Sequence, residues 1–322
     1  AIIAIINDRS KTDASKLDWT GLLSLCVGIA ALQLMLDRGQ RLDWFDSQEI
    51  IFEFILAIVC FYIFLSHIFT TNNPFINLNI FLNKNYFLGL LIMFLFGTIL
   101  WTPLILYPPM MQDLQNYPED LTGVFLALRG LGTLCGSTLL VFINKKLDPR
   151  FILSVGFLLQ GIAGFYMSHF DINLSAFELA WTNSLAGLGV GFVWVPLTLI
   201  TFNTLDKKFL NEASAFWHLI RNIGSSISIS ITIALVIRST AINYADLSSF
   251  ISIFGDSTSV MPLKGTTAPS GVESLSGLSK EIVRQSEMIG YINAFHLYYW
   301  IAFSIIPLVW LAPLKPQNKI GH

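Results

Sequence analysis

The sequence is poor in charged residues and in cysteine. Only 12% of its 322 residues are charged, whereas soluble domains carry about 25%. A formal net charge of −2 at pH 7 provides no basic field for a nucleic acid. Three cysteines stand alone in apolar runs, without the CxxC spacing of a zinc or redox site. These shortages argue against nucleic-acid binding, a disulfide framework and a metal centre.

Enzyme signatures are missing as well. The sequence contains no GxSxG, no nucleotide-binding loop, no HExxH and no pair of carboxylates spaced for hydrolysis. Nothing in it suggests a cofactor, and without a nucleotide-binding loop any transport is not driven by ATP on this chain. We therefore expect a protein that is not an enzyme and needs no cofactor.

Apolar residues are abundant, at 54% of the chain with a mean hydropathy of +0.63. About 20 such residues cross a bilayer core, and the bilayer is therefore the expected solvent and partner. The fold class predicted is all-α and polytopic, because helices satisfy their own backbone in lipid. Eight candidate spans are found, at residues 20–36, 49–69, 86–107, 121–143, 151–168, 179–203, 213–237 and 291–313.

Lysine and arginine set the expected orientation. Most of them fall on the side of the predicted spans that holds residues 7–19, 144–150 and 207–208. Basic residues in short loops are retained in the cytoplasm. We expect an inner-membrane protein with this side, and the C-terminus, in the cytoplasm.

The connecting segments divide the chain further. The apolar start "AIIAII" is too short to span and indicates the end of a truncated helix, so we expect a piece of a longer protein. Pro74 would open a short interfacial helix, although an ordinary loop fits the pattern equally well. In the extracytoplasmic loop, residues 253–279 should lack regular structure, and the stretch after them has helical spacing. The expected segments are 1–19 (truncated helix and linker), 20–71 (two spans), 72–85 (interfacial), 86–237 (five spans), 238–290 (extracytoplasmic loop) and 291–322 (last span and tail).

Arg129 is the most unusual residue, since it lies in the apolar stretch "FLALRGLGTLCGSTLLVF". A charge at mid-membrane costs about 2.5–3.5 kcal/mol on insertion scales, so it usually faces a bundle interior or a cavity. It could line a cavity, pair with a carboxylate, or tie backbone carbonyls together at the bundle core. Gly130 follows it directly, and Gly132 and Gly136 have GxxxG spacing. Such spacing indicates a close and mobile helix contact.

A second arginine, Arg221, lies in "SAFWHLIRNIGSSISISI". Helical spacing places Trp217, Arg221 and Gly224 near one face, with His218 a turn back from Arg221. The serine-rich run could line a polar path or simply pack helices together. His218 could titrate near neutral pH, but a lone histidine is weak evidence of proton transfer.

Three further features complete the candidate sites. Pro196 should kink the sixth span. The outer loop "LDRGQRLDWFDSQE" carries Asp37, Arg38 and Gly39, and is either a functional motif or a solvated loop. The tight turn "NKKLDPR" carries Asp148 and Arg150, which could clamp helix ends in one conformational state.

Together these stretches resemble the 14-helix drug:proton antiporters of the major facilitator superfamily, the EmrB/QacA type. The most specific match is "KLDWTGLLSLCVGIAALQLMLDRGQRLDWFDSQEI", which looks like the seventh helix and outer loop of that family. "NPFINLNIFLNKNY", "LRGLGTLCG…NKKLDPR", "VWVPLTLITFNTL" and "EASAFWHLIRNIGSSISISI" are similar to later parts. One departure is Leu128, where members commonly have proline, so this helix should be straighter.

The resemblance implies the C-terminal portion of a major facilitator fold, with two inserted helices followed by the six-helix C-terminal bundle. It implies proton-coupled multidrug export by alternating access, driven by the proton gradient. The implied partners are small amphiphilic substrates, a missing N-terminal six-helix half carrying the coupling residues, a periplasmic adaptor and an outer-membrane channel. The alternative is a non-transporting scaffold, or the remnant of a disrupted transporter gene.

Overall fold

The structure is a computed structural model that describes residues 18–71, 78–143, 147–249 and 272–313. In these residues it is all-helical and contains eight helices long and apolar enough to cross a membrane, in agreement with the eight predicted spans. Pro74, most of the N-terminal linker and the C-terminal tail lie outside the described residues.

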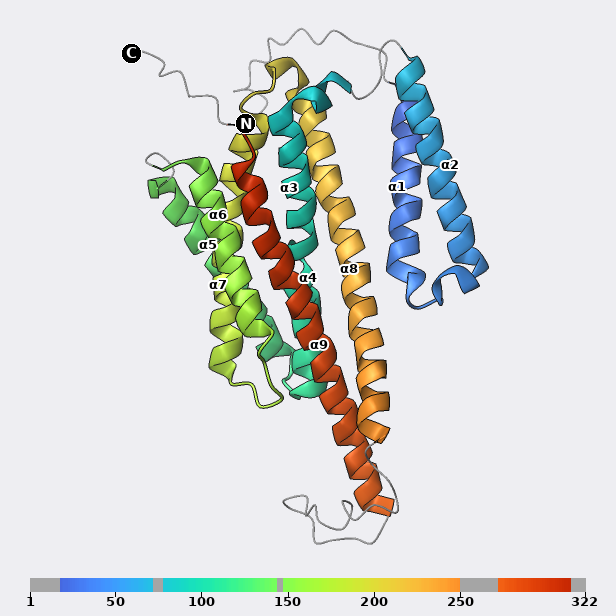
Figure 1. Cartoon of the computed structure of the whole chain (residues 1–322), viewed down its shortest axis with the longest axis vertical. Coiled ribbons are helices and arrows are strands. Elements are labelled where there is room, and N and C mark those ends of the chain that lie inside the picture. The colour runs from blue at the N-terminus through green and yellow to red at the C-terminus, as the bar shows by residue number, and fades with distance from the viewer. Residues whose placement is uncertain (1–17, 72–77, 144–146, 250–271, 314–322) are drawn as a thin grey trace, which may run out of the picture.

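The first two spans form a hairpin of α1 (Trp19–Gly39) and α2 (Gln48–Thr70). Asp18 caps α1 and also lies 2.8 Å from the Nε2 atom of His67 in α2, which ties the hairpin at one end. The hairpin stands beside the other helices and contacts them through α1 and α8 (Figure 1). Its outward side chains, Phe52, Tyr62 and Phe69 among them, are exposed in the isolated chain, as expected of a lipid-facing surface.

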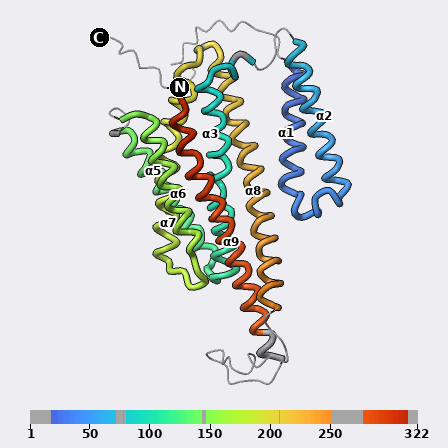
Figure 2. Tube along the Cα trace, viewed as in Figure 1, coloured from blue at the N-terminus to red at the C-terminus, as the bar shows by residue number. Residues whose placement is uncertain are grey.

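The remaining helices form one bundle. Its members are α3 (Lys84–Leu100), α4 (Thr102–Pro109), the π-helical turn η4 (Met110–Leu114), α5 (Glu119–Ile143), α6 (Pro149–Met167), α7 (Ala176–Phe202), α8 (Leu210–Ser249) and α9 (Val272–Trp310). The short 3-10 turns η2 (Trp44–Asp46), η3 (Leu78–Leu82) and η5 (Lys207–Phe209) precede α2, α3 and α8. Helix α3 packs against α7, α8 and α9, whereas α5 packs on α7, and α6 packs on both α7 and α9 (Figure 2).

Helix ends follow from local sequence. Asp148 accepts a hydrogen bond from the Arg150 N–H and Pro149 occupies the first turn, a pairing that starts α6. Ser175 and Glu178 form a reciprocal capping box at the start of α7. The end of the bundle with Lys84, Arg150 and Lys208 is called the basic end below. It is the end predicted to face the cytoplasm.

The core has two parts. Near the basic end, α3, α6, α7 and α9 bury Tyr86, Phe96, Phe157 and Tyr298. Toward the opposite end, Tyr107, Met111, Phe170 and Phe295 pack together. Aromatic side chains bury large areas and prefer edge contacts, as Phe96 makes with Phe157 at a centroid distance of 6.0 Å.

The predicted boundaries of the last loop are wrong. Helix α8 continues to Ser249 and α9 begins at Val272, so both enter the segment 238–290 that was expected to be a loop. At 40 residues, α8 is about 60 Å long, twice the roughly 30 Å of a hydrocarbon core. Hydropathy detects only the segment that crosses the membrane. Outside the predicted spans α8 and α9 still pack together, and Gly290 lies against Thr240 there. The helical spacing predicted after residue 279 is confirmed, but the helix already includes 272–279, which was expected to lack regular structure. Residues 253–271 lie outside the described part of the chain.

Candidate functional site

The third span is broken inside the bundle. Helix α3 ends at Leu100 and α4 begins at Thr102, with Trp101 between them. Pro103 has no N–H to give the Ile99 carbonyl, so the regular backbone ladder cannot pass this point. Trp101 is about 25 Å from the start of α3, inside a core of about 30 Å. Carbonyls freed there need donors from side chains, because lipid supplies none.

Helix α8 supplies two of these donors. Ser225 Oγ donates to the Gly97 carbonyl at 3.1 Å, and Ser228 Oγ donates to the Thr98 carbonyl at 2.5 Å. Thr102 Oγ1 also donates to the Thr98 carbonyl, at 2.9 Å. Both serines are buried. Of the two interpretations of the serine-rich run, helix packing is therefore favoured at these positions.

Arg129 supplies the next donor. Its Nη2 atom donates to the Leu100 carbonyl at 3.0 Å, and the residue is only 5% exposed. Within the described residues the partner is thus a carbonyl of this chain, as in the carbonyl-tie alternative. Its Nη1 atom is shielded and has no hydrogen-bond partner among those residues. The Tyr298 hydroxyl interacts with the guanidinium electrostatically without regular hydrogen-bond geometry. Within the described residues, Nη1 is therefore left without a regular hydrogen bond in the bundle core.

The glycines of α5 position Arg129 by close packing. Gly132 and Gly136 lie against the backbone of α7 at Ser184 and Leu188, where a Cβ atom would clash. Sequence reasoning missed the reciprocal glycines of α7, among which Gly187 lies against the Arg129 carbonyl. Thr133 Oγ1 joins the two helices by donating to the Gly187 carbonyl at 3.1 Å. The GxxxG prediction of close contact thus agrees with the geometry.

Gly130 differs from its neighbours. No atom lies within 4 Å of the position that its Cβ atom would take, so it faces away from the α5–α7 contact. Helix α5 itself runs without interruption from Glu119 to Ile143.

The cluster around Arg221 is arranged differently from the prediction. Trp217 and Gly224 are buried, and Gly224 lies against the backbone of Phe94 in α3. Arg221 itself is only half-buried. Its guanidinium bonds the neighbouring Asn222 side chain at 3.0 and 3.3 Å and lies 5.5 Å from the Trp194 ring centroid. The sequence placed Arg221 on one helix face with Trp217 and Gly224, but the Trp217 ring is buried in the interior whereas the Arg221 side chain is only partly buried.

The remaining candidates lie elsewhere. Pro196 is buried within α7, which continues through it. Arg38 pairs with Glu49 of α2, and Gly39 lies under the Trp44 ring. Asp37 and His218 are exposed. The candidate residues are therefore split among the bundle core, the α1–α2 turn and the start of α6 at Asp148 and Arg150.

The model of the Major Facilitator Superfamily matches residues 14–229, which is most of the chain. The chain belongs to the major facilitator superfamily. It is 27% identical over 315 residues to the multidrug export protein EmrB of Escherichia coli K12, covering 97% of this chain and 61% of that protein. It is also 27% identical over 307 residues to the fatty acid resistance protein FarB of Neisseria gonorrhoeae, covering 94% and 60%.

Among solved structures, a bacterial homolog of the human lysosomal transporter Spinster, inward-facing and unoccupied, aligns with a TM-score of 0.49 and 12% identity, covering 91% of this chain and 70% of that one. The chain spans about three fifths of the length of its EmrB-type relatives. The family match and the EmrB-type relatives confirm three expectations. The chain resembles EmrB, its fold is helical and polytopic, and it belongs to a family of transporters and not of enzymes.

Proposed function

We propose that this chain is the C-terminal portion of a proton-coupled exporter of amphiphilic compounds. Two helical bundles would rock around a midplane site, as in other transporters built from repeats. The N-terminal bundle would come from the remainder of the protein, together with the coupling acids. The relatives are named for multidrug export and fatty acid resistance, and both names are compatible with an amphiphilic cargo.

The observation that carries the proposal is the Arg129 site. A broken helix in the membrane is stable only where its backbone is buried in protein or lines a cavity. Here the break is joined to α5 by Arg129 and to α8 by Ser225 and Ser228. The unused Nη1 donor of Arg129 would be available to a group that arrives in another conformational state.

The helix contacts around this site suit relative movement. The α5–α7 contact and the α3–α8 contact are both made through glycines, at Gly132, Gly136, Gly97 and Gly224. Small side chains let backbones approach closely and slide without large side-chain rearrangement. The break at Trp101 would serve as the hinge between α3 and α4.

The proposed setting is the inner membrane, with the basic end and the C-terminus in the cytoplasm. In this setting the far ends of α8 and α9 project into the periplasm, toward the adaptor and outer-membrane channel implied by the Gram-negative relatives. The alternative is a membrane scaffold that does not transport, and the following experiment distinguishes it from an exporter.

The test uses everted membrane vesicles that contain the protein with its N-terminal bundle. Respiration acidifies such vesicles, and a proton-coupled exporter should release the gradient when cargo is added. Ethidium, chloramphenicol and nalidixic acid represent a cation, a neutral compound and an anion, and a pH-sensitive acridine dye reports the gradient. We expect a response to at least one compound, and no response to any of them would overturn the proposal.

Arg129 is compared in the same vesicles as Arg129→Ala and Arg129→Lys, with membrane abundance measured in parallel. Loss of the proton response at normal abundance would support a transport role. Loss of abundance in both variants would show that the arginine serves only to hold the helices together.

A further inference from the structure

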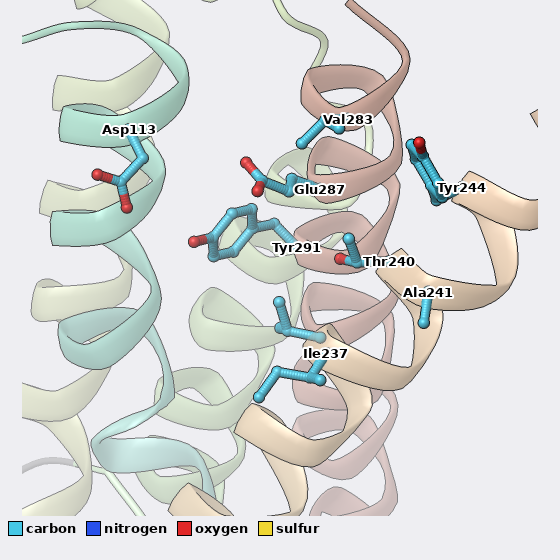
Figure 3. Close-up of a pocket in the computed structure, with 9 residues that line it drawn as sticks. Asp113, Ile237, Thr240, Ala241, Tyr244, Val283, Glu287 and Tyr291 are labelled. Atoms are coloured by element: carbon cyan, nitrogen blue, oxygen red, sulfur yellow. The ribbon is translucent and has the colours of Figure 1, made fainter. Parts of the chain in front are cut away.

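A pocket of about 470 Å³ lies between η4, α8 and α9, toward the end of the bundle opposite the basic end (Figure 3). It is separate from the Arg129 site and is formed where α8 and α9 extend past the predicted spans. Its volume falls within the roughly 300–1,000 Å³ typical of small-molecule sites. None of the candidate residues from the sequence lines it.

Two carboxylates give the pocket its charge. Asp113 of η4 and Glu287 of α9 line it from different helices (Figure 3), and they are close enough to interact electrostatically. The described residues that line the pocket include no lysine or arginine. The nearby Arg284 is engaged elsewhere, because it donates to the Leu114 carbonyl at 3.1 Å and pairs with Glu281 at 3.7 Å. Among the described residues, no basic side chain therefore compensates the two carboxylates of the pocket.

The rest of the lining is aromatic and apolar. Tyr291 directs its ring into the same space as the two carboxylates, and α8 contributes Tyr244, Ile237 and Ala241. The Thr240 hydroxyl oxygen also lines the pocket, is shielded from solvent, and has no hydrogen-bond partner in the described part of the chain. Aromatic faces and carboxylates together attract cations. An apolar wall favours the hydrocarbon part of the same ligand.

We propose that this pocket is a binding site for an amphiphilic organic cation. The charge complements the two carboxylates, and the apolar body fits the wall formed by α8. That the bound cation is a transport substrate rests on the proposed function, whereas the binding of the cation does not.

The binding test uses a matched pair of probes, tetraphenylphosphonium and tetraphenylborate, which share size and shape but differ in the sign of their charge. Each is titrated into the purified 322-residue chain in nanodiscs of neutral lipid, and bound probe is counted after correction for empty nanodiscs. We expect saturable binding of the phosphonium alone. Equal saturable binding of both probes, or of neither, would overturn the proposal.

Charge and shape are then separated by substitution. Asp113→Asn with Glu287→Gln should weaken phosphonium binding about tenfold, since the variant loses both negative charges of a partly exposed site. Asp246→Asn is the matched control, because Asp246 is an exposed carboxylate of α8 outside the pocket. Ala241→Trp should block the site sterically without a change of charge. Unchanged phosphonium binding in both the double variant and Ala241→Trp would also overturn the site.

The two proposals fail separately. If the chain binds the phosphonium as expected but vesicles show no proton-coupled response to any compound, the site stands and the exporter function falls. If vesicles respond but the chain shows no charge-selective binding, the function stands and this site falls.

Discussion

The Nη2 atom of Arg129 in α5 donates to the carbonyl of Leu100, the last residue of α3, at 3.0 Å. One buried guanidinium therefore covers a backbone acceptor that a helix break leaves open. The charge is placed where the α3–α4 break requires a donor, and its position in an apolar stretch has a structural reason in addition to any role in transport.

Removal of this donor should destabilise the bundle. In Arg129→Ala the Leu100 carbonyl loses its partner, and a buried unsatisfied acceptor costs about 1–3 kcal/mol. We expect a lower thermal unfolding temperature of the detergent-solubilised chain, followed by fluorescence-detected size exclusion. Arg221→Ala is the control, because its guanidinium is half-exposed and bonds only Asn222 among its hydrogen-bond partners in the described residues. Equal losses in the two variants would contradict this assignment.

The glycines of α5 should divide into two classes. Gly132→Ala would place a Cβ atom against the Ser184 carbonyl of α7 and should lower stability, since backbone cannot move aside as a side-chain tip can. Gly130→Ala meets no atom within 4 Å and should be neutral or stabilising by up to about 1 kcal/mol from helix propensity. Thermal unfolding of both variants provides the measurement. A Gly130 variant as damaged as the Gly132 variant would refute this division.

A similar contrast applies at the start of α6. Asp148→Ala removes the side chain that accepts the Arg150 N–H, and loss of an N-cap costs about 1 kcal/mol. Asp171→Ala is a comparison on the opposite end, where the carboxylate accepts the Asn173 N–H within a turn and caps no helix. We expect the larger decrease in unfolding temperature for Asp148→Ala. A reversed order would show that capping is not the role of Asp148.

The eight spans could be predicted because their helices must match the bilayer, and hydropathy records that match directly. The extension of α8 and α9 could not be predicted, because it depends on contacts between the two helices, such as that between Thr240 and Gly290. The hydrogen-bond acceptor of Arg129 could not be predicted either. Every residue has a backbone carbonyl, and only the helix break at Trp101 leaves the Leu100 carbonyl available. Pro103 was the available signal for that break.

The carboxylates of the pocket between η4, α8 and α9 could not be predicted from the sequence either. Asp113 and Glu287 are far apart in the sequence and neither stands in a motif. They come together because η4 ends the third span beside the extended part of α9. Their proximity depends on the full length of α9, which hydropathy does not reveal.

The last prediction concerns coupling between Pro103 and Arg129. Pro103→Ala restores an N–H that can donate to the Ile99 carbonyl and should allow α3 and α4 to join into one helix. In a continuous helix the Leu100 carbonyl would be satisfied by the backbone N–H of Leu104, and Arg129 would lose its function as donor. Arg129→Ala should therefore destabilise the Pro103→Ala background less than the natural chain. A double-mutant cycle of unfolding temperatures measures this difference. Pro149→Ala is the control background, because Pro149 lies in the first turn of α6, where no intrahelical donor is needed. Additive effects of Pro103→Ala and Arg129→Ala would show that the break and the arginine are independent.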